Sequence, residues 1–153
     1  MLAAPVVAMI YSPRMAKKQS KSRNSSDRLY RIFVSHATAD KWLATTLCEK
    51  LDFAGATTFR DDRDIDGGDD IPERLRREIS RSRELVVLVT PESVNRPWVL
   101  LEVGGAWLKG IRITPILCHI TVDRIPDLIK AKKAVPINEF DAYLESLRRR
   151  LQS

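Results

Sequence analysis

The hydrophobic positions of the chain alternate between strand-like runs and helical stripes. Apolar or β-branched runs typical of strands occupy residues 29–35, 57–60, 85–89, 113–120 and 134–137. Apolar side chains at helical spacing follow them and predict helices near residues 38–54, 72–81, 97–109 and 140–151. The run at 85–89 has no polar position, which is typical of a strand covered on both faces. The pattern predicts an α/β fold, a parallel sheet with helices on both faces.

Ligands of such sheets bind beyond the carboxyl ends of the strands. The segments in which a site is expected are therefore 35–40, 61–71, 90–98 and 118–125. One feature of the fourth strand run is unusual, because Pro115 lacks the backbone donor that a central strand uses.

The charge of the chain is concentrated at its beginning. The formal net charge of the 153 residues is +6, and residues 1–28 contribute six basic side chains against one acidic side chain. Residues 29–153 hold the other 20 basic and 19 acidic side chains, which is no excess for neutralising phosphates. We expect a disordered basic leader over 1–28 and a single domain over 29–151, with no nucleic-acid partner.

The apolar run near the start of the chain and the two cysteines indicate where the protein is expected and whether it holds zinc. The apolar run at residues 2–11 is too short to span a bilayer, so no membrane partner is expected. Cys48 and Cys118 lie in apolar periodic segments and are interpreted as buried free thiols in a reducing, cytoplasmic compartment. Without a CxxC pair and with only two histidines, the chain cannot build an ordinary structural zinc site.

A calcium-loop pattern is present in the acidic segment that precedes Pro72. The pattern D-x-D-x-D-G-x5-E is completed by Asp62, Asp64, Asp66, Gly67 and Glu73. Its context argues against a site, because a strand pattern stands where the entering helix should be and no second loop is available for pairing. We therefore predict no metal.

Glu102 is the only ionisable residue between Pro97 and Leu108. A carboxylate in an apolar stretch pairs with a distant base, faces water or belongs to a site, and the spacing alone favours a structural role. Trp98 lies four residues earlier on the same helix face, and an aromatic ring beside a carboxylate suits a sugar or a nucleotide. The chain has no Walker A, GxGxxG or GxSxG motif, and no acceptor aspartate of a receiver domain follows the run at 85–89.

Five segments in order resemble a Toll/interleukin-1 receptor (TIR) domain, particularly the bacterial kind. The sequence RIFVSH at 31–36 resembles the first box of the family, and residues 61–72 with Gly67 and Gly68 resemble its BB loop. The sequence LVVLVTP at 85–91 is similar to the third strand and its exit. The sequence PWVLLEV at 97–103 matches W-x-x-x-E, and ITPIL at 113–117 resembles a fourth strand in which proline is common.

The resemblance implies a flavodoxin-like five-stranded parallel sheet and one of two functions. Many bacterial TIR domains cleave NAD+ at the nicotinamide–ribose bond, whereas others only form scaffolds through TIR–TIR contacts. In the enzymatic members the glutamate of W-x-x-x-E is essential, which corresponds to Glu102, with Trp98 beside the nicotinamide–ribose part. Ser35, His36 and the loop from Asp66 to Ile71 would border the pocket.

From this resemblance we expect an NAD+ hydrolase or cyclase similar to the Thoeris-like effectors or signal producers of antiphage defence. NAD+ would be the substrate, and no cofactor is expected. The expected partners are further copies of the chain, joined through TIR–TIR contacts, and a separate effector or sensor protein. Two alternatives stay open: a non-catalytic TIR adaptor, and an enzyme similar to nucleoside 2-deoxyribosyltransferases, which share the layout and a catalytic glutamate.

Overall fold

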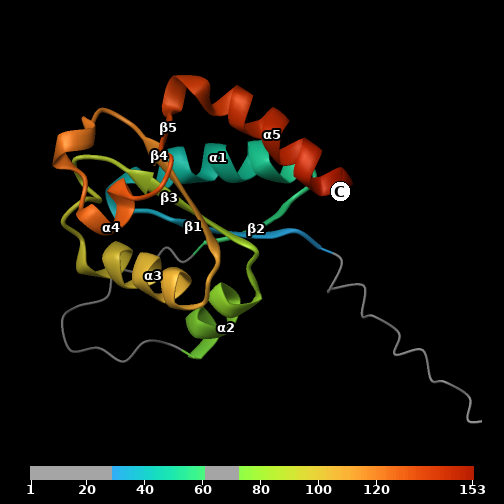
Figure 1. Ribbon diagram of the computed structural model, residues 1–153, viewed down its shortest axis with the longest axis horizontal. Coiled ribbons are helices and arrows are strands. Elements are labelled where there is room, and N and C mark those ends of the chain that lie inside the picture. Colours follow the sequence, from blue (N-terminus) through green and yellow to red (C-terminus); the bar gives the residue numbers. More distant parts are fainter. Residues whose placement is uncertain (1–28, 61–72) are drawn as a thin grey trace, which may run out of the picture.

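A computed structural model of the chain describes residues 29–60 and 73–153. In these residues five strands form one sheet in the order β2-β1-β3-β4-β5, and every neighbouring pair is parallel (Figure 1). The strands are β1 (Arg31–Ser35), β2 (Thr57–Phe59), β3 (Glu84–Val89), β4 (Arg112–Leu117) and β5 (Val135–Pro136). The helices are α1 (Lys41–Phe53), α2 (Glu73–Arg81), α3 (Pro97–Leu108), α4 (Asp127–Lys130) and α5 (Phe140–Gln152). This is the predicted five-stranded parallel α/β architecture.

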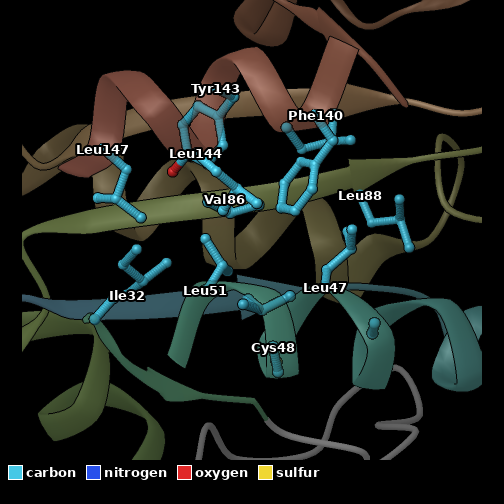
Figure 2. Packing of buried hydrophobic residues seen from close by; sticks show 14 of the residues in the cluster. Ile32, Leu47, Cys48, Leu51, Val86, Leu88, Phe140, Tyr143, Leu144 and Leu147 are labelled. Carbon is cyan, nitrogen blue, oxygen red and sulfur yellow. The ribbon is translucent and has the colours of Figure 1, made fainter. Parts of the chain in front are cut away.

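Helices cover both faces of the sheet. Successive residues of a strand point to opposite faces, so each strand packs against helices on both sides. Ile32 of β1 packs with α1 and α5, while its neighbour Phe33 packs in the cluster on the side of α2 and α3. All six residues of β3 are buried, as the uninterrupted apolar run at 85–89 predicts. Figure 2 shows the first cluster, in which leucines of α1 and α5 meet Ile32, Val86 and Leu88 from the sheet.

The ends of two elements depend on left-handed backbone conformations. Gly55 follows the C-cap of α1 with φ at +107°, a conformation that glycine adopts without steric cost, and it ends the helix where the sequence predicts. The fourth strand was predicted to run to residue 120, but β4 ends at Leu117. The chain bends there, and His119 has φ at +54°, which is incompatible with an extended strand.

Pro115 fits within β4 because of the short length of β5. The pairing between these strands joins only Ile116 with Val135 and Leu117 with Pro136. Pro115 pairs with Val87 of β3 and with no residue of β5, so the missing donor of proline interrupts no ladder on the β5 side.

A buried carboxylate network ties α5 to the amino end of the sheet. Glu84, the first residue of β3, is fully buried. Its Oε1 accepts hydrogen bonds from Thr114 Oγ1 at 2.6 Å and Tyr143 OH at 2.8 Å. Its Oε2 accepts from Tyr30 OH at 2.9 Å and Arg150 Nη2 at 3.0 Å. A buried charge with this many donors is compensated, so the network is a structural one.

Both cysteines are free and buried, as expected. No helix in the described part of the chain is long and apolar enough to cross a membrane. The predicted leader over 1–28 and the acidic segment 61–72 lie outside the described residues.

Candidate active site

Two predicted site residues meet at the carboxyl end of β1. Ser35 is the last residue of this strand, and its Oγ donates a hydrogen bond to Oε2 of Glu102 on α3. The two residues are 1% and 2% exposed, respectively. Almost no water reaches the pair, so the serine hydroxyl holds one oxygen of the carboxylate in a fixed direction.

The local sequence explains why α3 presents Glu102 to this strand. The chain leaving β3 forms a tight turn in which Ser93 N donates to Thr90 Oγ1 at 3.1 Å and Thr90 N donates to Ser93 Oγ at 2.9 Å. Pro97 then stands in the first turn of α3, where its missing donor costs nothing. The helix begins in a fixed place, and Glu102 follows on its buried face.

A second polar contact lies at the same edge of the sheet. Thr90 Oγ1 donates to Asp40 Oδ2 at 2.5 Å, which joins the exit of β3 to the short 3-10 turn Thr38–Asp40 before α1. Burial, together with the charge of Asp40, raises the pKa of the Cys118 thiol just after β4. The thiol therefore stays protonated and unreactive near neutral pH.

A groove of about 520 Å³ between α2 and α3 includes Glu102 in its lining. This volume is in the range of small-molecule sites. The walls are largely apolar, with Leu75 and Ile79 from α2 and Leu101 and Leu108 from α3. Among the described lining residues Glu102 is the single acidic residue, and at 2% exposure it has almost no contact with water.

The groove is widened by two glycines and bordered by two cations. A Cβ added at Gly104 or Gly105 would meet no atom within 4 Å, so each glycine leaves open space beside α3. Arg76 from α2 and Lys109 after α3 belong to the lining, and both side chains are exposed. The arrangement can hold an elongated ligand whose negatively charged part lies at the cationic border.

The predicted site residues fall into three groups. The structure brings Ser35 and Glu102 into contact, and it buries His36 directly after Ser35 at the same strand end. Trp98 shares the buried face of α3 with Glu102, but its ring belongs to the core cluster against the sheet and is 9% exposed. Asp66 and Ile71 lie outside the described residues.

Sequence reasoning missed the contribution of the outer face of α3. Trp107, Gly105 and Leu108 line the groove, and Trp107 is 54% exposed. A signal was present, because PWVLLEVGGAWL is apolar on all sides apart from Glu102, and a helix with apolar residues on all sides is expected to be covered on more than one face. The cations Arg76 and Lys109 gave no such signal, since isolated basic residues on helices are usually solvated.

No group of three or more potential ligands for a metal ion occurs within 29–60 and 73–153. The aspartates of the calcium-loop pattern, Asp62, Asp64 and Asp66, lie outside that part of the chain.

Comparisons with known proteins agree on one family. A family model described as "TIR domain" matches residues 32–151. The 2' cyclic ADP-D-ribose synthase BtTIR of Bacteroides thetaiotaomicron is 26% identical over 129 residues, which cover 78% of this chain and 45% of that protein. The chain thus spans less than half the length of this curated relative.

Two solved structures are similar in fold. The TIR domain of the Toll-related receptor TRR-2 from Hydra magnipapillata has a TM-score of 0.63 and 21% identity, with 80% of this chain and 98% of that chain covered. The TIR domains of the activated Roq1 resistosome, which directly recognises the effector XopQ, have a TM-score of 0.53 and 20% identity, with 80% and 77% covered. At these identities the likeness supports the sheet and helix arrangement alone.

Proposed function

The chain belongs to the TIR domain family, and from that premise we propose that it cleaves NAD+ at the bond between nicotinamide and ribose. The observation that carries the proposal is Glu102, a buried carboxylate that lines an apolar groove and is held by Ser35. The bacterial relative named as a cyclic ADP-ribose synthase supports this chemistry, since its product retains the ADP-ribose part of NAD+.

The proposed reaction separates a neutral leaving group from a cation. The bond between ribose C1′ and the nicotinamide nitrogen breaks, both electrons leave with nicotinamide, and an oxocarbenium-like ribosyl centre develops. The Glu102 carboxylate stabilises this positive charge, and it does so strongly because water is excluded around it.

The second step decides the product. Water attacks C1′ and gives up a proton, so that NAD+ and water yield ADP-ribose, nicotinamide and one proton. In a cyclase, a hydroxyl of the same substrate attacks instead. We propose that Glu102 accepts the proton in either case and that Ser35, which donates a hydrogen bond to Glu102, acts through it as a positioning residue.

The groove offers a place for the rest of the substrate. Its volume of about 520 Å³ and its exposed Trp107 suit an aromatic base, and Arg76 and Lys109 suit the diphosphate. We assign Trp98 to holding α3 against the sheet beside the nicotinamide–ribose end, because its ring packs in the core. No cofactor takes part in the proposed reaction, and NAD+ enters as substrate only.

Self-association is part of the proposal. Two large aromatic side chains of α1, Trp42 and Phe53, are 70% and 89% exposed, so they are accessible to a second copy of the chain, and aromatic residues are enriched in interfaces. TIR domains occur together in the Roq1 resistosome, and a similar contact between copies of this chain would use such side chains. The role in antiphage defence that the sequence resemblance suggests is proposed on the same basis, and phage plating on cells with and without the protein tests it.

Incubation of the pure protein with NAD+ tests the proposed activity. We expect free nicotinamide to accumulate, to the same extent with and without a metal chelator. A non-catalytic adaptor would release none. An enzyme similar to nucleoside 2-deoxyribosyltransferases would leave NAD+ intact and exchange the base of a deoxynucleoside, so the same incubation with deoxyadenosine and free cytosine separates the three functions.

A further inference from the structure

A second hollow lies at the edge of the sheet opposite the contact between Ser35 and Glu102. Its volume is about 440 Å³, and it is lined by the start of β4, the chain before β5 and one face of α5. Arg112 is the first residue of β4, whereas Ser35 is the last residue of β1. The hollow is therefore at the amino ends of the parallel strands, and it shares no lining residue with the groove that includes Glu102.

One buried carboxylate that contacts residues of the lining is already compensated. Glu84 is fully buried and accepts hydrogen bonds from three hydroxyl groups, those of Tyr30, Thr114 and Tyr143. Burial and the charge of Glu84 raise the pKa of Tyr143, so this hydroxyl stays protonated and continues to donate. The guanidinium of Arg150, 3.0 Å from Glu84, balances its charge.

The other charged residues of the lining leave a positive excess. Lys132 and Lys133, which precede β5, form no ion pair with any described residue. Arg112 is 3.7 Å from the Glu84 carboxylate, and its side chain is 55% exposed. Against these three cations the lining contains one acidic residue, Glu139. Cations gathered in a concave surface repel one another, and an anion bound among them relieves that repulsion.

The hollow also contains an uncharged hydrogen-bond donor. Ser146 lines it, and its Oγ accepts a hydrogen bond from Arg150 Nη1 at 2.9 Å. The hydroxyl hydrogen of Ser146 has no acceptor within the described residues, so it can be donated to a ligand. The hollow thus combines flexible ammonium groups with a directional hydroxyl donor, a combination that suits phosphate oxygens.

We propose that this hollow binds a small phosphorylated molecule that carries at least two negative charges, such as a diphosphate ester. A space of about 440 Å³ is larger than a single phosphate needs and falls in the range of small-molecule sites. A concave site with cations on several sides favours a compact anion over nucleic acid, whose backbone needs an extended basic surface. The proposal does not depend on NAD+ cleavage, because it uses none of the residues around Glu102.

Calorimetric titration of the full chain with inorganic pyrophosphate, and separately with ADP, at physiological salt tests the proposal. We expect at least one of the two to bind, and the double variant Lys132→Glu/Lys133→Glu to weaken that binding at least tenfold. The matched control Lys50→Glu/Arg81→Glu makes the same change in net charge on exposed side chains outside the hollow. It should leave the affinity within about twofold of the parent chain.

Two further measurements make the outcome decisive. Arg76→Glu/Lys109→Glu should bind the same probe with unchanged affinity, which separates this hollow from the cations that border the groove between α2 and α3. Circular dichroism of each variant confirms that it is folded. Failure of the parent chain to bind either probe at millimolar concentration would overturn the proposal. So would an equal loss of affinity in the two charge-matched double variants, or binding of duplex DNA at Lys132 and Lys133 without binding of either probe.

Discussion

Removal of the Ser35 hydroxyl tests whether this residue positions Glu102. In Ser35→Ala the carboxylate loses a donor at a place where both residues are almost fully buried, so water cannot replace it. A hydrogen bond to a charged group contributes about 1.5–3 kcal/mol, and the buried setting favours the upper part of that range. If the loss falls on the transition state, kcat/KM for NAD+ decreases about ten- to hundredfold.

The assay separates a positioning role from a merely structural one. Nicotinamide release is followed at several NAD+ concentrations, and we expect kcat to fall while KM changes little, because Ser35 acts through Glu102. Ser35→Thr keeps the hydroxyl and should recover part of the rate. Ser82→Ala is the matched control: Ser82 is also buried, and it donates to the Glu78 carbonyl at 2.7 Å, away from Glu102. Full activity of Ser35→Ala beside an inactive Glu102→Gln would refute the reasoning.

Three further predictions concern the groove, the buried network and self-association. Gly105→Ala should stabilise α3 by about 0.5–1 kcal/mol in thermal unfolding, yet raise KM for NAD+, because the added methyl points into open space beside the groove. The raised pKa of Tyr143, caused by burial and by the charge of Glu84, makes the folded state keep a proton that the unfolded state loses above pH about 10. Stability should then fall with rising pH, and Tyr143→Phe should reduce the loss of stability between pH 10 and 11 by about 1 kcal/mol in urea unfolding. Specific activity should rise with protein concentration over a hundredfold range, and Phe53→Glu should reduce the rise; flat activity with monomeric elution throughout would contradict self-association.

The sequence predicted the sheet well because its strands carry local signals. The run at 85–89 has no polar residue, and β3 is buried throughout, as expected. Gly55 ends the first helix because glycine adopts the left-handed conformation observed there, and this residue can be recognised in the sequence. The short helix α4, with four residues, was missed because it is shorter than the repeat from which a helical pattern is recognised.

The sequence could only partly predict the candidate site. It placed Ser35 and Glu102 at the correct strand end and helix, but their contact joins residues 67 positions apart, which no local pattern encodes. The network of Glu84 and Arg150 is of the same kind, with 66 positions between donor and acceptor. The spacing predicted that Trp98 shares a helix face with Glu102, and both residues are buried on α3. The family resemblance implied that Trp98 lines the nicotinamide–ribose side, and its ring packs in the core cluster.

The central claim is that the Glu102 carboxylate stabilises the ribosyl cation formed when NAD+ is cleaved, and Glu102→Gln tests it most directly. Glutamine keeps the size of the side chain and an oxygen that can accept from Ser35, but it removes the charge. Nicotinamide release is compared among the parent chain, Glu102→Gln and the control Glu92→Gln, which changes an exposed carboxylate before α3. The account predicts that kcat/KM falls at least about a hundredfold, roughly 3 kcal/mol, in Glu102→Gln alone, with unchanged circular dichroism. A folded Glu102→Gln protein that retains the turnover of the parent chain would contradict it.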